Sequence, residues 1–169
     1  FIYIGLTYTL ISITKFILLN KQKFIQWDKK ITNLIYSYRS PNTHVEGFIK
    51  LITRGYGIGP ILVLCLLFTK NQLAIFLTLG LILLINFLVV EILIKRSIKR
   101  NRPNSKLHSY SFPSTHSTAC TMSVCLIAAN LDIFYDPYIV FIPAIVWSLF
   151  VLVSRILYGH HYFLDVLFG

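Results

Sequence analysis

Long apolar segments, separated by short polar stretches, make up most of the sequence. Segments of about 20 apolar residues can cross a lipid bilayer as helices, whereas shorter ones require tilting or burial inside a bundle. The pattern therefore predicts an all-α, polytopic membrane protein that forms a single domain over residues 1–169. Because the apolar pattern is still running at both ends, we expect the sequence to be part of a longer protein. The apolar segments cover about residues 1–19, 57–68, 73–94, 118–131 and 138–158, and a sixth begins near residue 161.

Apolar residues follow a helical period between the first two of these segments. The spacing predicts an amphipathic helix that lies in the membrane interface, with Asp28, Lys29 and Lys30 on its polar face. The dipeptide Ser40-Pro41 interrupts the pattern, and a plain connector with incidental periodicity is the alternative. The apolar positions are Phe24, Trp27, Ile31, Leu34 and Tyr38 before the interruption, and Val45, Phe48, Ile49 and Ile52 after it.

Composition indicates a membrane protein with an anionic partner. The chain has 56% hydrophobic and only 13% charged residues, whereas soluble domains hold about 25% charged residues. The net charge of +10 must lie outside the spans, because a charge at the bilayer centre costs several kcal/mol. This points to a phosphorylated lipid or the headgroup surface rather than to nucleic acid. The three cysteines, Cys65, Cys120 and Cys125, lie in apolar runs and indicate packing rather than disulfide bonds.

Hairpin connections between the spans sort the polar segments onto two sides of the membrane. Residues 21–56, 95–117 and 159–161 share one side, and residues 69–72 and 132–137 share the other. Nearly all Lys and Arg residues therefore lie on one side. The rule that positive loops are cytoplasmic would place this side in the cytoplasm, although an anion-binding site would gather cations there for its own reason.

The first candidate motif, KRSIKRNRP, leaves the third span. Lys95 and Arg102 are seven residues apart, which predicts that they share one face of a helix that continues until Pro103 stops it. Two such cations suit a phosphoryl group, Arg as a planar fork and Lys as a point charge. Taken alone, the motif favours a basic cluster that touches lipid headgroups nonspecifically.

The second candidate motif, SFPSTHS, precedes the fourth span. Ser114, Thr115 and His116 fall at the start of a helix, where unpaired backbone N–H groups and the helix dipole favour an anion. Ser114 adds a hydroxyl donor, and His116 has a side chain suited to proton transfer. Taken alone, an ordinary Ser/Thr helix cap with an incidental histidine is the favoured interpretation.

The third candidate motif, SRILYGHHYFLD, joins the fifth apolar segment to the sixth. Arg155 lies in the last turn of the fifth span, and Gly159 is a natural stop for that helix. His161 and Asp165 are four residues apart, so on a sixth helix they would share a face, and the carboxylate could fix the imidazole tautomer. His160 has no such partner in the sequence. A capping role for the histidines is the alternative.

The predicted topology brings these three motifs to the same side of the membrane. No cluster of Asp, Glu, His or Cys has the spacing of a metal site, and of the six acids only Asp165 adjoins the motifs. The combination predicts a phosphoryl-transfer site that uses a histidine nucleophile, without a metal ion or another cofactor.

The motifs resemble the three-part signature of the type 2 phosphatidic acid phosphatases, the PAP2 lipid phosphatases. That signature is Lys-x6-Arg-Pro, Pro-Ser-Gly-His and Ser-Arg-x5-His-x3-Asp, in this order. Thr115 replaces the family's glycine, which leaves the backbone N–H available but narrows the pocket. The resemblance covers about residues 28–169 and implies a six-helix transmembrane bundle of PAP2 type, cut short here in its sixth helix, with interfacial helices. The matching residues are Lys95, Arg102 and Pro103, then Pro113, Ser114 and His116, then Ser154, Arg155, His161 and Asp165.

The resemblance also implies the role of each site residue. His161 attacks phosphorus and forms a phosphohistidine, Asp165 orients it, and His116 protonates the leaving oxygen. The equatorial phosphate oxygens are held by Lys95, Arg102, Arg155 and Ser114, with a backbone N–H near Thr115.

Relatives of this kind imply a lipid phosphate as substrate and the bacterial inner membrane as location, with the site facing the periplasm. Candidate substrates are undecaprenyl diphosphate, phosphatidylglycerol phosphate, phosphatidic acid and the phosphates of lipid A. Two alternatives remain open at this point. One is a non-catalytic membrane transporter of anions or lipids that uses the same cations, and the other is a related enzyme that oxidises substrates with bound vanadate.

Overall fold

The computed structural model describes residues 21–39, 43–53, 57–104 and 107–169. These residues form helices and no β-strand, which confirms the all-α prediction for this part of the chain. The predicted first span, residues 1–19, lies outside the described residues. The helices are α2 (Lys21–Ser37), α3 (Thr43–Ile52), α4 (Gly59–Phe68), α5 (Gln72–Ile85), the π-helix η2 (Asn86–Ile94), α6 (Lys95–Ile98), α7 (Thr115–Ala129), the short 3-10 helix η3 (Leu131–Ile133), α8 (Pro137–Leu157) and α9 (Phe163–Leu167).

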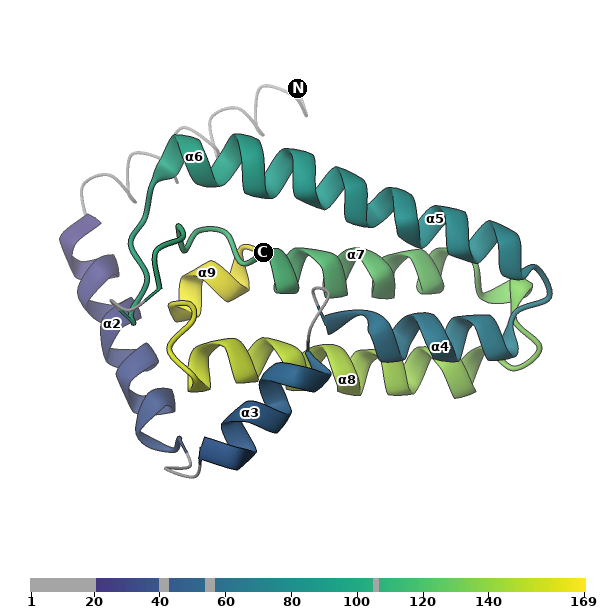
Figure 1. Ribbon diagram of the computed structural model, residues 1–169, viewed down its shortest axis with the longest axis horizontal. Helices are drawn as coiled ribbons and strands as arrows, with labels where there is room; N and C mark the ends of the chain where they lie inside the picture. Colours follow the sequence, from purple (N-terminus) through teal and green to yellow (C-terminus); the bar gives the residue numbers. More distant parts are fainter. Residues whose placement is uncertain (1–20, 40–42, 54–56, 105–106) are drawn as a thin grey trace, which may run out of the picture.

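Helical segments lie side by side and form the body of the molecule (Figure 1). α5, η2 and α6 follow one another as one rod, which packs with α4 and α7, and both of these pack against α8. α4 and α5 are apolar around their whole circumference, so the sides that meet other helices form a core and the others stay exposed. Cys65 and Cys120 are buried free thiols, which agrees with the packing role predicted for them, whereas Cys125 is exposed and does not pack in the core. The core side chains include Ile61, Cys65, Leu79, Ile127, Val140 and Ala144.

Two described helices are long and apolar enough to cross a membrane. They are Gln72–Ile98 and Pro137–Leu157, and only 28% and 39% of their most apolar windows are buried. Such exposure of long apolar helices indicates contact with lipid, because water-soluble proteins bury most of this surface. α4 is apolar but has only 10 residues, so six transmembrane helices stay a prediction. Outward apolar side chains on these helices include Leu77, Leu81, Leu84, Leu93, Ile142, Val146, Leu149 and Val153.

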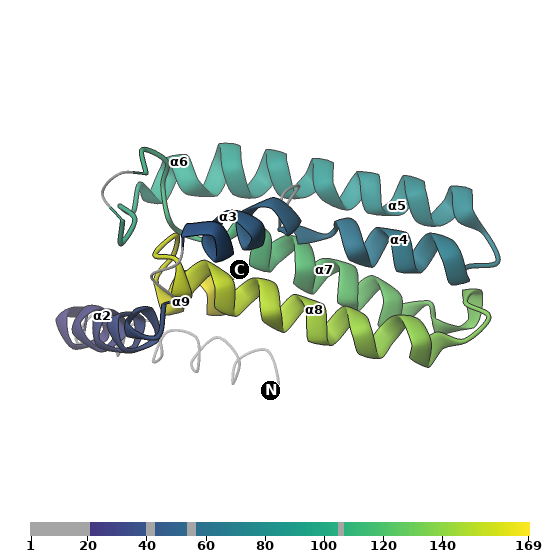
Figure 2. The same ribbon diagram turned by 60° about the horizontal axis from the view of Figure 1, so that its bottom comes forward.

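The two connections at the far end of the bundle are tied together. The N–H of Lys70 donates to the carbonyl of Ile133 at 2.8 Å, and the N–H of Tyr135 donates to the carbonyl of Phe68 at 2.9 Å. This pairing places residues 69–72 and 132–137 at one end, as the hairpin topology predicts. α2, α3, α9 and the segment after α6 gather at the opposite end (Figure 2).

α2 lies across that opposite end, against α8 and α9, but its buried face differs from the prediction. Asp28 is 0% exposed, whereas Trp27 is 48% exposed and Leu34 is 60% exposed. The assignment of Asp28 to an exposed polar face is therefore wrong, although Lys29 and Lys30 are exposed as predicted. The reason is tertiary, because Asp28 accepts a hydrogen bond from the backbone of α9.

The helix that carries Lys95 ends earlier than predicted. α6 stops at Ile98, and Lys99 adopts a left-handed conformation with φ 52°. The N–H of Lys99 donates to the carbonyl of Lys95 at 2.9 Å, which closes the last turn. Arg102 is therefore not on a common helical face with Lys95. After Lys99 the chain instead leaves the helix, and Arg102 contacts His160 and His161 in the turn between α8 and α9.

Candidate active site

The residues of the three motifs meet at one end of the bundle. α6 ends there, α7 and α9 begin there, and α8 ends there (Figure 1). Burying ionisable side chains is costly, so such a gathering needs partners or a function. His116 and Arg102 are half-buried at the same end. The buried members are Lys95, Ser114, Thr115, Arg155, His161 and Asp165.

His161 is held by a turn that follows α8. Gly159 has φ +68° and reverses the chain, after which the N–H groups of His160 and His161 donate to the carbonyl of Arg155 at 3.0 and 3.1 Å. Nδ1 of His161 lies 2.7 Å from the carbonyl oxygen of Ser111. Because a carbonyl only accepts, this contact assigns the proton to Nδ1 and leaves the lone pair on Nε2.

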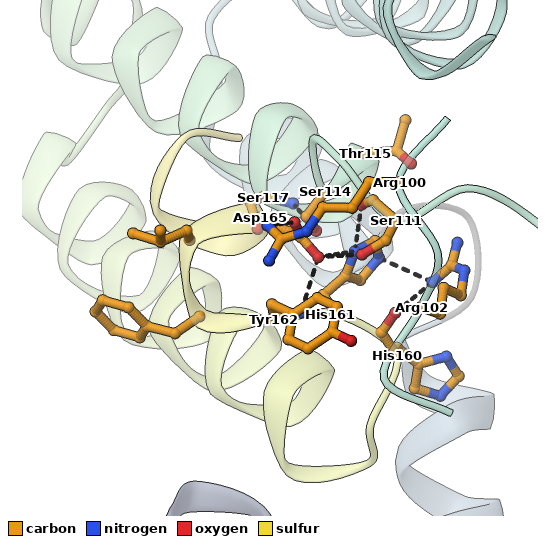
Figure 3. Close-up of polar contacts among 12 residues, drawn as sticks. Arg100, Arg102, Ser111, Ser114, Thr115, Ser117, His160, His161, Tyr162 and Asp165 are labelled. Carbon is orange, nitrogen blue, oxygen red and sulfur yellow. Dashed lines mark hydrogen bonds and ion pairs between the residues drawn. The ribbon is translucent and has the colours of Figure 1, made fainter. Parts of the chain in front are cut away.

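The lone pair of His161 faces a guanidinium group. Nε2 lies 3.1 Å from Nη1 of Arg102 (Figure 3). Burial lowers the pKa of His161 to about 4, and the positive charges of Arg102 and Lys95 act in the same direction, while Asp165 opposes them. The imidazole is therefore neutral at neutral pH, with Nε2 available to an electrophile that displaces the Arg102 contact.

Asp165 holds His161 through an intermediary rather than directly. Nδ1 of His161 is 3.8 Å from Oδ2 of Asp165, too far for a hydrogen bond. α9 begins only at Phe163, so the predicted helical face shared by His161 and Asp165 does not form. Ser111 links the two side chains, because its carbonyl accepts from His161 and its hydroxyl donates to Oδ2 of Asp165 (Figure 3).

Arg102 is surrounded by neutral acceptors. Nη1 donates to the carbonyl of His160 at 2.7 Å, and Nε donates to the carbonyl and the hydroxyl of Ser109 at 3.1 and 3.0 Å. Burial lowers the pKa of Arg102, while the carboxylates of Glu91 and Asp165 raise it. The guanidinium therefore stays charged without a direct carboxylate partner, which suits an incoming anion.

Lys95 is paired with a carboxylate that was not predicted from the sequence. Its Nζ lies 2.7 Å from Oε1 of Glu91 and 2.7 Å from the hydroxyl of Thr115, and that hydroxyl lies 2.6 Å from the same oxygen of Glu91. The inference that only Asp165 among the acids adjoins the motifs is therefore wrong. An acid four residues before Lys95 in an apolar span was the available signal.

Arg155 has an unsatisfied donor inside the site. Its Nη2 donates to the hydroxyl of Thr53, a buried residue that follows α3. Its Nε is buried and has no hydrogen-bond partner among the described residues. Buried donors are nearly always satisfied, so this N–H group is suited to an acceptor that comes from outside the chain.

The start of α7 is built as a capped helix end. Ser114 is the N-cap, and its side chain accepts from the N–H of Ser117 at 3.3 Å, while its own N–H donates to the carbonyl of Asp165 at 2.8 Å. His116 follows in the first turn, and the positive charge of Arg155 and the imidazoles of His161 and His160 act on its ring. The cap and the histidine are thus in the same cluster.

An open cavity adjoins this cluster. It has a volume of about 560 Å³ and lies between α2, α3 and the turn at Gly159. Pro103, the neighbour of Arg102, also lines it. The cavity is therefore large enough for a polar group that extends from the cluster, and its polar lining includes Asn33, Arg39, Glu46, Lys50 and Asn104.

Four further polar residues were not identified from the sequence: Asp28, Glu91, Arg100 and Ser111. Only Glu91 carried a signal, through its spacing from Lys95. Among the residues that the structure describes, no group of three or more His, Cys, Asp or Glu side chains could hold a metal ion. The cluster combines cations, a neutral imidazole and a helix start, which together can bind a phosphoryl group and attack it.

Comparison with known proteins agrees with this geometry. The family model of the PAP2 superfamily matches residues 75–169, which include all three motifs. A solved structure, a transmembrane PAP2 type phosphatidylglycerolphosphate phosphatase from Bacillus subtilis, is similar with a TM-score of 0.63 and 23% sequence identity. The similarity covers 93% of this chain and 86% of that chain, and it shows a shared fold. No curated protein matches the chain in sequence.

Proposed function

Because the chain belongs to the PAP2 superfamily and is therefore a phosphatase, we propose that it hydrolyses a phosphomonoester or diphosphate of a membrane lipid through a phosphohistidine intermediate. The observation that carries this proposal is the neutral imidazole of His161, whose Nε2 faces the guanidinium of Arg102 at 3.1 Å. A neutral lone pair beside a cation is the arrangement that attack on a bound phosphoryl group requires.

In the first half-reaction, Nε2 of His161 forms a bond to phosphorus as the bond to the leaving oxygen breaks. His116 donates its proton to that oxygen, so a free alcohol leaves from a monoester, or a lipid monophosphate leaves from a diphosphate. The Arg102 N–H that contacts Nε2 in the free site then moves to a phosphate oxygen. Lys95, Arg155, Ser114 and a backbone N–H near Thr115 hold the remaining charge.

In the second half-reaction, water attacks the phosphorus of the phosphohistidine. His116 takes up the proton of that water, the P–N bond breaks, and inorganic phosphate leaves with His161 restored to its neutral form. Both steps place negative charge on the same equatorial oxygens, so the same cations serve both of them.

A lipid substrate fits the position of the cluster at the end of the apolar helices. The tails would remain in the bilayer along the exposed faces of α5 and α8, and the cavity of about 560 Å³ would take the rest of the headgroup. Phosphatidylglycerol phosphate is the first substrate to test, since the similar solved structure carries that name. Undecaprenyl diphosphate, phosphatidic acid and lipid A phosphates follow. We also propose that the site faces the periplasm across a bacterial inner membrane.

Phosphate release from these lipids by purified protein tests the proposal. We expect the wild-type protein to release inorganic phosphate from at least one lipid phosphate in detergent micelles, at the same rate with and without a chelator, because no step uses a metal ion. Measurement of inorganic phosphate over time, with a no-enzyme control for each lipid, gives the result. Activity that a chelator abolishes would contradict the metal-independent mechanism, and no release from any of the lipids would contradict the substrate class.

The protonation state of His161 gives a second test. A pKa of about 4, caused first by burial, keeps the imidazole neutral around pH 5.5, where an ordinary histidine with a pKa of about 6.5 is mostly protonated. We expect the nucleophile to remain in its active form as the pH falls through that window, and to be lost only near its own pKa. Nitrogen NMR of histidine-labelled protein follows this directly. The Arg102→Ala variant should raise the pKa of His161, and a wild-type His161 that titrates at its ordinary value would contradict the assignment.

A further inference from the structure

Asp28 is a buried carboxylate on α2, although its neighbours Lys29 and Lys30 are exposed. Its side chain is 0% exposed, and Oδ1 accepts from the N–H of Leu164 at 2.9 Å. The neighbouring N–H of Phe163 donates to the hydroxyl of Thr32 at 2.9 Å, and the ring of Phe163 contacts Trp27 edge to face. Side chains of α2 therefore satisfy the first N–H groups of α9, the helix that carries Asp165.

Arg100 joins Asp28 to Asp165. One guanidinium nitrogen, Nη2, pairs with Oδ2 of Asp28, and the other, Nη1, lies 2.5 Å from Oδ1 of Asp165. The same guanidinium lies over the ring of Tyr162, 4.3 Å from its centroid. A planar fork can hold two carboxylates in a fixed relation, which a flexible ammonium group does not do as well.

The backbone of Arg100 reaches the nucleophile by a second route. Its carbonyl accepts from the N–H of Ser111 at 2.7 Å. Ser111 in turn accepts from Nδ1 of His161 and donates to Asp165 (Figure 3). Arg100 thus holds both groups that fix the ring of His161, and Asp28 is the only other carboxylate that the described structure pairs with Arg100.

We infer that Asp28 and Arg100 are positioning residues for the nucleophile. Through them, α2 keeps Asp165 and Ser111 in the positions that aim Nε2 of His161 at the bound phosphoryl group. The inference rests on the proposed function. In the part of the chain that the structure describes, the ion pairs of Asp28 and Arg100 involve none of the cations proposed to bind phosphate. We therefore expect these two residues to affect the rate of attack and not the binding of the anion. A misplacement of the nucleophile by about 1 Å can lower the rate about a hundredfold.

Asp28→Asn is the most selective variant. The asparagine keeps an oxygen that can accept from the N–H of Leu164, so the hydrogen bond that caps α9 remains. Its uncharged amide cannot form the ion pair with Arg100. We expect kcat for lipid phosphate hydrolysis to fall roughly tenfold to a hundredfold with KM unchanged, and the same for Arg100→Gln. The double variant should be no slower than Arg100→Gln alone, because both changes break one link. Lys29→Gln is the matched control, an exposed charge next to Asp28 that should leave kcat unchanged.

Nitrogen NMR of His161 distinguishes a change in the position of its ring from a general loss of protein stability. The wild-type ring should carry its proton on Nδ1, and Asp28→Asn should mix the two tautomers while thermal unfolding in detergent stays cooperative. If Asp28→Asn does not fold, Arg100→Lys carries the same test and should lower kcat with KM unchanged. Wild-type kcat in Asp28→Asn, or losses that multiply in the double variant, would overturn the inference. A wild-type protein that releases no phosphate would overturn the proposed function instead, and the tautomer measurement would still decide the positioning role.

Discussion

Replacing His161 by alanine is expected to lower kcat for lipid phosphate hydrolysis by roughly a thousandfold or more. The loss should be this large because His161 is the described imidazole that contacts Arg102, and without it water would have to attack the phosphoryl group directly, with no phosphohistidine intermediate. Substrate binding should survive, since the cations remain. Phosphate release measured over long incubations gives the residual rate, and acid-labile phosphoprotein trapped during turnover should be present in the wild type and absent from His161→Ala.

His160→Ala is the matched control for that variant. Both histidines follow Gly159. His161 contacts Arg102 through its ring, whereas the hydrogen bond from Arg102 to His160 goes to the backbone carbonyl. Alanine keeps that carbonyl. We therefore expect His160→Ala to retain most of the activity. Equal losses in the two variants would mean that the nucleophile has been assigned to the wrong histidine, and an undiminished rate in His161→Ala would rule out the phosphohistidine mechanism.

The gathering of the three motifs could be predicted because it depends on topology. Because the chain reverses direction between one apolar segment and the next, the polar segments at alternate connections lie at the same end of the bundle. Local signals were also readable where one residue type decides the backbone, as at Gly159, which adopts a positive φ, and Ser114, which caps α7. The apolar runs also predicted α8 and the combined length of α5 and η2 to within one residue at each end, but not the change from α-helix to π-helix at Asn86.

The details that failed depend on partners far away in the sequence. The left-handed conformation of Lys99, which ends α6 and redirects Arg102, is one that a lysine rarely adopts, so the residue type gives no warning. The burial of Asp28 depends on Leu164 and Arg100, which pack against it only in the folded protein. Periodicity measures the average polarity of a face, and it cannot distinguish a solvated acid from one that caps another helix.

Charge pairing distinguishes the cations of the cluster from one another. Lys95 is paired with Glu91, and Arg100 is shared between two aspartates. Arg102 and Arg155 instead contact neutral groups in the described structure: carbonyls, hydroxyls and the ring of His161. A phosphate that enters the cluster therefore meets no competing carboxylate at these two arginines, and Arg102 alone also contacts the nucleophile. Its loss should have the larger effect on both binding and attack.

Arg102→Ala is expected to lower kcat/KM by about a hundredfold to a thousandfold, because it removes a charged donor that strengthens its contacts as charge develops on the phosphoryl oxygens. Arg102→Lys should recover only part of this loss. The planar guanidinium can donate to the carbonyls of Ser109 and His160 and to a phosphate oxygen at the same time, whereas a single ammonium group cannot reach all three. Arg96→Ala is the matched control, an exposed cation on α6 whose removal should leave kcat/KM unchanged. Steady-state kinetics on one lipid phosphate, at constant ionic strength, compares the three. Full recovery in Arg102→Lys would mean that Arg102 acts as a point charge, and an equal loss in Arg96→Ala would mean that the cluster acts through its overall potential and not through this contact.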